Sequence, residues 1–341
     1  LAAVALVAGA AVAGAQPLPK AHLKMTGLPN NQLVYRNFEQ PFWSKELAEK
    51  TGGAVTVDIR GMNEMGLKGN EIGRLIKSGV LDGGSAVMGW LVADDPRFEA
   101  IDLPGLNPDI ATARKVSQAY RPVLDKVWHE KYDAKLLAVW SSSAQVVFCK
   151  TPVGSLADLK GRKIRASTRT LAEFVEAFGG IGVTMNFGEV PQALQTGVVD
   201  CAITGVLAGY SSKYGDVADY VYAMPLGWSQ VGMGVSNKAW NKMHPKTREA
   251  VLREVKAFEN RLWEAAEGET ALGFACATGS GSCSAGTPAK MKLVKVSPED
   301  TARVTKMLNE VTAGKWGKRC GKACVAEFNA TVGAVVPVKI R

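Results

Sequence analysis

Residues 155–205 read SLADLKGRKIRASTRTLAEFVEAFGGIGVTMNFGEVPQALQTGVVDCAITG, and this stretch decides the fold. Glycines at 161, 179, 180 and 197 divide it into short apolar segments. The spacing of the apolar residues predicts strands at 163–167, 183–187 and 198–203, with helices at 171–178 and 189–195 between them. Strands that alternate with helices are typical of an α/β fold, in which helices cover the faces of a sheet.

One arginine, Arg165, lies at the end of the first predicted strand. In α/β folds of this kind, ligands bind at the carboxyl ends of the strands. The planar guanidinium group matches a carboxylate with two parallel hydrogen bonds. We therefore expect Arg165 to hold a carboxylate ligand. The alternative is that Arg165 is a surface residue or a structural residue of the strand.

The rest of the chain continues the same pattern. Further strands are predicted at 23–26, 55–59, 85–88, 136–139, 145–150 and 230–236. Further helices are predicted at 38–50, 70–78, 111–131 with an interruption at Pro122, 247–274, and from Ser297 onward. The helix that begins at 247 would be roughly 40 Å long, which exceeds the width of one small domain. Pattern alone allows either one large sheet or two α/β units.

The composition is that of an ordinary globular protein, with 47% hydrophobic and 21% charged residues among 341. The net charge of +9 comes from scattered basic residues, and no nucleic-acid motif accompanies them. Residues 1–15 are small and apolar and end in Ala13-Gly14-Ala15, which predicts a signal peptide and export. The scattered charge without such a motif leads us to expect no nucleic-acid partner. No later segment has 18 consecutive apolar residues, so we also expect a protein that is not membrane-embedded.

Six cysteines favour an oxidising compartment. Cys276 with Cys283, and Cys320 with Cys324, are spaced for small local disulfides, whereas Cys149 and Cys201 are either buried thiols or a pair on neighbouring strands. The spacing does not match a zinc site, and none of the three histidines stands beside a cysteine. The chain also lacks the nucleophile elbow of the α/β-hydrolases and the phosphate-binding loop of nucleotide hydrolases. No catalytic residue is predicted.

Four motifs together resemble the substrate-binding proteins of tripartite ATP-independent periplasmic (TRAP) transporters, the DctP-like family. They are EKTGGAVTVDIRG (49–61), IKSGVLDGG (76–84), DLKGRKIRAS (158–167) and MNFGEVPQALQTGVVD (185–200). The resemblance implies two α/β lobes joined by a hinge, with a long helix at about 245–274 that spans both. It places residues 16–144 and 230–255 in lobe I, and residues 145–229 and 256–341 in lobe II.

The resemblance also implies a site and a function. The ligand-binding residues expected from it are Arg165, Gln145, Phe187, Thr204, Trp228, Trp90 and Asn37. Gln145 stands where sialic-acid binders of the family carry a second arginine, which favours a monocarboxylate or 2-oxo acid. No cofactor is expected, although a cation beside the ligand carboxylate is compatible with the family.

The resulting expectation is a periplasmic receptor, not an enzyme, that delivers a small organic acid to a TRAP-type membrane permease. Two alternatives use the same cleft. One is a periplasmic lyase or hydrolase, and the other is a ligand sensor for a membrane kinase.

Overall fold

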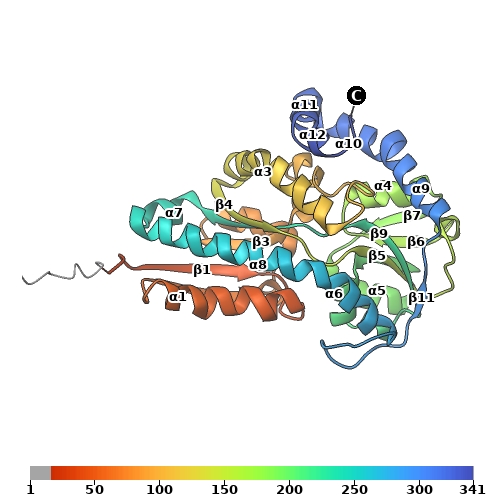
Figure 1. Cartoon of the computed structure of the whole chain (residues 1–341), viewed down its shortest axis with the longest axis horizontal. Coiled ribbons are helices and arrows are strands. Elements are labelled where there is room, and N and C mark those ends of the chain that lie inside the picture. The colour runs from red at the N-terminus through yellow and green to blue at the C-terminus, as the bar shows by residue number, and fades with distance from the viewer. Residues whose placement is uncertain (1–16, 341) are drawn as a thin grey trace, which may run out of the picture.

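The computed structural model describes residues 17–340, so the expected signal peptide at 1–15 lies outside the described residues. The described chain forms two separate β-sheets (Figure 1). The first sheet has the order β2-β1-β3-β10-β4. Its strands are β1 (Ala21–Gly27), β2 (Val55–Gly61), β3 (Gly83–Val87), β4 (Ala134–Trp140) and β10 (Val231–Ser236). β10 runs antiparallel to both of its neighbours, whereas β1 is parallel to β2 and β3.

The second sheet has the order β11-β9-β5-β8-β6-β7. Its strands are β5 (Gln145–Cys149), β6 (Lys163–Ala166), β7 (Ile181–Thr184), β8 (Cys201–Gly205), β9 (Tyr220–Gly227) and β11 (Lys292–Val294). β6 is parallel to β7 and β8, and β5 is antiparallel to β8 and β9. The α/β patterning predicted from residues 155–205 is thus confirmed, and it belongs to this second sheet.

Helices surround both sheets. Those before the first crossover are η1 (Tyr35–Glu39), η2 (Phe42–Glu46), α1 (Leu47–Lys50), η3 (Met62–Met65), η4 (Gly69–Glu71), α2 (Ile72–Lys77), η5 (Met88–Leu91), η6 (Pro96–Glu99) and α3 (Ile110–Tyr132). Those of the second unit are η7 (Leu156–Leu159), α4 (Arg169–Ala177), η8 (Phe187–Glu189), α5 (Val190–Thr196), α6 (Val206–Ser211) and η9 (Tyr214–Asp216). The C-terminal set is α7 (Asn237–Lys242), α8 (Pro245–Thr278), α9 (Pro298–Met307), η10 (Leu308–Thr312), α10 (Ala313–Cys320), α11 (Lys322–Ala330) and α12 (Val332–Val335).

Two short crossovers and one long helix connect the sheets. The chain passes from β4 to β5 through residues 141–144, and returns from β9 to β10 through residues 228–230. The crossovers are bonded to each other, because the Ser141 hydroxyl donates to the Trp228 carbonyl at 2.7 Å. Helix α8 contacts β4 and α3 on the side of the first sheet and α6 and β11 on the side of the second (Figure 1). No helix within residues 17–340 combines the length and the apolar character needed to cross a membrane.

Three details differ from the sequence predictions. α3 continues through Pro122 without interruption, because one side of the helix is buried in the core and holds it in place. β7 ends at Thr184, so Phe187 begins the turn η8 instead of ending a strand. Just beyond the end of β7, the carbonyl of Met185 accepts hydrogen bonds from Arg165 instead of from a neighbouring strand. β8 runs to Gly205, which places Thr204 inside the strand.

The C-terminal segment returns to the first sheet. α9 lies against the second sheet, where Asp300 accepts hydrogen bonds from the Leu156 amide and the Tyr222 hydroxyl. α12 instead contacts α3, and the Trp316 indole of α10 donates to the Pro96 carbonyl at 2.7 Å. The expected boundaries placed all of residues 256–341 in lobe II. We propose that lobe II ends near α9 and that α10–α12 belong to lobe I.

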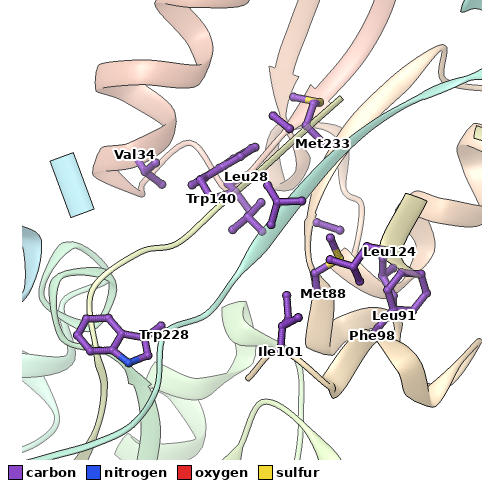
Figure 2. Packing of buried hydrophobic residues seen from close by; sticks show 14 of the residues in the cluster. Leu28, Val34, Met88, Leu91, Phe98, Ile101, Leu124, Trp140, Trp228 and Met233 are labelled. Carbon is purple, nitrogen blue, oxygen red and sulfur yellow. The ribbon is translucent and has the colours of Figure 1, made fainter. Parts of the chain in front are cut away.

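The main hydrophobic core lies under the first sheet, passes the crossovers and continues onto the second sheet, where it includes residues of β5, β8 and β9. Figure 2 shows Met88, Leu91, Phe98 and Leu124 gathered in this core, with Trp228 on the second crossover. A second, smaller cluster fills the space between the second sheet and α4. The two sheets therefore share one continuous apolar cluster, and the second sheet has a further cluster of its own on the side of α4.

All six cysteines form disulfides: Cys149–Cys201, Cys276–Cys283 and Cys320–Cys324. The two local pairs confirm the prediction from spacing. For Cys149 and Cys201 the sequence left two readings open, and the structure supports pairing because these residues face each other on the adjacent strands β5 and β8.

Candidate functional site

A small cavity of about 30 Å³ lies between the two sheets, next to the crossovers. Its lining comes from both sheets and from both crossovers. The lining residues are Leu28, Gln32, Val87, Trp90, Ser142, Gln145, Arg165, Ser167, Phe187, Thr204, Ala208, Ser229 and Val231. Five of the seven residues expected from the sequence are therefore brought together here. Arg165 is the one charged residue among the lining residues of this cavity.

Arg165 is held on β6 with its side chain only 1% exposed. Its Nη1 donates to the Ile203 carbonyl at 2.9 Å, and its Nη2 and Nε donate to the Met185 carbonyl at 3.2 and 3.3 Å. The guanidinium has five N–H groups and these bonds use three of them. The fork is thus fixed by backbone carbonyls while donors remain for a ligand.

The charge of Arg165 has no carboxylate partner among residues 17–340 that the structure describes. Each of its hydrogen bonds goes to a neutral carbonyl. Burial lowers the pKa of Arg165 from its usual value, and the nearby Tyr214 acts in the opposite direction. A buried cation without an anion carries a desolvation cost. An anionic ligand in the cavity would offset that cost.

Gln145 begins β5 at the end of the first crossover, and its side-chain amide is fixed at both ends. Its Nε2 donates to Asp102 at 3.2 Å, and its Oε1 accepts from the Ser167 hydroxyl at 3.1 Å. Ser167 follows Arg165 by two residues, and in a strand such residues point to the same side. Gln145 and Ser167 together give the cavity a neutral polar wall beside the guanidinium.

Phe187 and Trp90 provide apolar walls from the two sides of the cavity. Phe187 in η8 stacks on the buried Tyr214, with ring centroids 6.2 Å apart. Trp90 in η5 packs over Gly69, where the Cβ atom of any larger residue would overlap its ring. Both rings are half-buried. They would contact the apolar body of a ligand whose carboxylate meets Arg165.

Thr204 lines the cavity from β8, but two other expected residues do not reach it. Asn37 is exposed on η1 and is absent from the lining. Trp228 is buried in the core, where its indole donates to the Asn107 carbonyl at 2.8 Å. The structure thus places Asn37 and Trp228, both predicted to bind the ligand, outside the lining of this cavity. The neighbour of Trp228, Ser229, lines the cavity in its place.

Several lining residues were missed by sequence reasoning. Ser167 could have been found, because it follows Arg165 at the strand period of two. Ser142 and Ser229 lie in the crossovers, and their approach to the cavity depends on how the two sheets are joined. Local sequence carries no signal for that arrangement.

A larger cleft of about 1480 Å³ adjoins the cavity and shares Trp90, Ser167 and Phe187 with it. Residues from opposite sides of the cleft meet near its rim. Lys68 lies 3.6 Å from Glu189, and the Asn31 amide donates to the Ser212 hydroxyl at 3.1 Å. These contacts join the first-sheet side to the second-sheet side beside the cleft.

The described residues contain no cluster of three or more histidine, cysteine, aspartate or glutamate side chains that could hold a metal ion. The site as described is thus one buried cation, a set of neutral polar groups and two aromatic walls. This arrangement suits recognition of an organic anion by hydrogen bonding and charge.

Comparison with known proteins agrees with this geometry. Residues 26–316 match the DctP family, described as bacterial extracellular solute-binding protein, family 7. The C4-dicarboxylate-binding periplasmic protein DctP of Rhodobacter capsulatus is 30% identical over 210 residues, which are 60% of this chain and 62% of that protein. This chain thus spans less than two thirds of the length of that relative.

Solved structures match over more of the chain. An extracytoplasmic solute receptor of Bordetella pertussis that binds pyroglutamic acid is 25% identical, with a TM-score of 0.79, and the match covers 91% of this chain and 99% of that one. A TRAP periplasmic solute-binding protein of Shewanella oneidensis with bound succinate has a TM-score of 0.75 at 19% identity, covering 93% and 99%. At that identity the second likeness supports the fold alone.

Proposed function

Because the chain belongs to the DctP family of bacterial extracellular solute-binding proteins, we propose that it is a periplasmic receptor for a small organic acid. The acid carries one carboxylate, as in a monocarboxylate or 2-oxo acid, and the receptor delivers it to a TRAP-type membrane permease. The binding step needs no covalent chemistry, in keeping with a family of binding proteins.

The observation that carries this proposal is the buried, carboxylate-free guanidinium of Arg165 in the lining of the cavity. A ligand carboxylate would form charge-assisted hydrogen bonds with the donors that the backbone carbonyls leave unused. The lining contains no second cation, so a second carboxylate on the ligand would lie unpaired in a desolvated site. This difference favours acids with a single negative charge.

The ligand would bind across both sides of the cavity. Arg165, Thr204 and Phe187 come from the second-sheet side, and Trp90 comes from the first-sheet side. A ligand stabilises a closed form only through contacts that exist in that form. Contacts with residues on both sides of the cleft meet this condition, and closure would shield the ion pair from water.

A thermal-shift screen of organic acids tests the proposal, since a ligand that binds the native state raises the melting temperature. Monocarboxylates such as L-pyroglutamate and pyruvate are expected to raise it more than succinate. Calorimetry with the best acid then compares the wild type with Arg165→Ala. Losing one partner of a buried charge pair costs about 2–5 kcal/mol, which is a loss of affinity of about 30-fold or more.

Lys163→Ala is the matched control, because Lys163 is exposed on the same strand and is absent from the cavity lining. It should retain wild-type affinity. The proposed function fails if no organic acid shifts the melting temperature, and the role of Arg165 fails if Arg165→Ala binds the acid as tightly as Lys163→Ala.

A further inference from the structure

Asp102 is a carboxylate with an unusual set of partners. It lies in the loop between η6 and α3, on the first-sheet side, yet it bonds the second crossover and the first residue of β5. Its Oδ1 accepts from the Trp228 amide at 2.8 Å, and its Oδ2 accepts from the Ser229 amide at 3.0 Å. The same Oδ2 accepts from Gln145 Nε2 at 3.2 Å.

Two of these partners, Gln145 and Ser229, line the ligand cavity, whereas Asp102 itself does not. The packing around the carboxylate leaves little room. A Cβ atom at Gly227 would lie 2.8 Å from Gln145 Nε2 and 3.1 Å from the Asp102 carboxylate oxygens. Only glycine at 227 allows the second crossover to approach this closely, so the contact between Asp102, Gln145 and the crossover is built into the backbone.

The hydrogen bonds fix the orientation of the Gln145 amide. An ionised carboxylate only accepts, so the amide must turn its Nε2 toward Asp102 and its Oε1 toward Ser167. A protonated Asp102 has an O–H that must donate, and the Gln145 Oε1 is then the suitable acceptor. The amide would turn over and present Nε2 to Ser167 and the cavity.

We infer that Asp102 is a positioning residue, which fixes the Gln145 amide and the second crossover together and so sets the polarity of the ligand cavity. The ligand in this inference rests on the proposed function. The inference itself concerns one carboxylate whose hydrogen bonds couple the Gln145 amide to the second crossover. No enzyme chemistry is involved.

Asp102 is expected to ionise within a pH range that is accessible to experiments on the folded protein. Burial raises the pKa of Asp102 to about 7, and the hydrogen bonds from Trp228, Ser229, Asn107 and Gln145 act in the opposite direction. Because the pKa in the folded protein lies above the unfolded value, the stability contribution is fully present at low pH and declines as the pH rises through about 7. A bound anion repels the ionised form, so ligand affinity should also fall as the pH rises through neutrality.

The pH-dependent effects of other charged groups near this region must be distinguished from those of Asp102. Glu269 of α8 accepts from the Ser142 hydroxyl on the first crossover, and burial raises its pKa to about 7 as well. Glu99 of η6 is buried beside Arg319 and Thr170, and Arg165 faces the cavity. A variant at Asp102 and a variant at Glu269 are therefore both required.

The first test needs no ligand. In the apo protein, the amide NMR signals of Trp228 and Ser229 and the side-chain NH₂ of Gln145 are followed from pH 5.5 to 8.5, a window of about 1.5 units on each side of the expected midpoint. These signals should titrate with one midpoint near 7 in the wild type and in Glu269→Gln, and should be flat in Asp102→Asn. Signals that do not titrate in the wild type, or titrate alike in Asp102→Asn, overturn the inference.

The second test measures affinity for L-pyroglutamate by calorimetry at pH 6 and pH 8. Wild-type affinity should fall at least about fivefold between these values, and the affinity of Asp102→Asn should stay constant. Asp300→Asn is the control for general loss of stability, because Asp300 is buried far along the chain in α9 and bonds Leu156 and Tyr222. It should keep the wild-type pH profile.

The two tests separate the two proposals. If no organic acid binds the wild type, the proposed function fails, and the NMR titration still decides the role of Asp102. If pyroglutamate binds but the profile of Asp102→Asn matches that of the wild type, the role of Asp102 fails and the proposed function stands.

Discussion

At the scale of single residues, the site depends on which groups accept hydrogen bonds from Arg165. The backbone carbonyls of Met185 and Ile203 orient the guanidinium without neutralising it. A carboxylate side chain in their place would satisfy the charge and leave nothing for a ligand. In the proposed site, neutral acceptors around the buried cation would keep it available for an anion, at a cost in desolvation that the ligand would offset.

Substitutions at Thr204 test whether an uncharged hydroxyl group of the cavity lining binds the ligand. Thr204→Val keeps the shape of the side chain and removes its hydroxyl group. If that hydroxyl donates to the ligand, its loss costs about 0.5–1.5 kcal/mol, or roughly two- to tenfold in affinity for the acid found in the screen. Thr204→Ser, which keeps the hydroxyl, should bind within about twofold of the wild type. Equal calorimetric affinities for the valine and serine variants would contradict this role.

Sequence reasoning predicts some residues of the site and not others for a physical reason. Arg165 was predicted because it lies at the end of a strand whose boundaries follow from local apolar spacing. Asp102, by contrast, stands in a loop with no periodicity, and its partners are distant in the chain. Its position depends on the long-range joining of two sheets. Local pattern is equally silent on which residue of the second crossover lines the cavity, where Ser229 lies in the lining and the neighbouring Trp228 does not.

At the scale of secondary-structure elements, β5 and β8 form the centre of the second sheet and carry Gln145 and Thr204 to the cavity. The Cys149–Cys201 disulfide joins these strands at directly opposed positions. The sequence predicted both strands but left the pairing of their cysteines open. Pairing requires the strands to be adjacent, and adjacency of strands separated by a helical unit is not visible in local pattern.

Replacing Cys149 and Cys201 together by alanine should lower the free energy of unfolding. The disulfide closes a loop between residues 52 positions apart, and loss of such a constraint costs about 2–4 kcal/mol. Urea unfolding followed by circular dichroism measures the change. The same substitutions at Cys276 and Cys283, which are only seven positions apart, should cost less. Equal losses for the two double variants would contradict this expectation.

At the scale of the whole molecule, the C-terminal helix α10 closes a connection between the two sides of the cleft. Arg319 at its end bonds Glu173 of α4, on the second-sheet side, and lies 3.4 Å from Glu99 of η6, on the first-sheet side. Glu99 also accepts from the amide and hydroxyl of Thr170, each at 3.1 Å. Side chains of α10, α4 and η6 thus join the two sides of the cleft in addition to the chain crossovers.

Arg319→Ala should therefore weaken the closed form without changing the cavity. Glu99 and Glu173 would lose the cation that they share, and buried Glu99 would be left with Thr170 alone. Because an organic acid is released from the closed form by opening, its dissociation rate should rise by roughly three- to tenfold, while the association rate changes little. Stopped-flow fluorescence measures both rates, and small-angle scattering should show a larger average radius of gyration for the ligand-free variant.

Arg303→Ala provides the matched comparison for Arg319→Ala. Arg303 also bonds two carboxylates, Glu299 and Asp300, but all three residues lie on α9. Removing it disturbs a similar ion network within one side of the cleft, so the dissociation rate and the radius of gyration should stay at wild-type values. If Arg303→Ala and Arg319→Ala accelerate dissociation equally, the effect comes from general loss of C-terminal packing and not from a connection across the cleft.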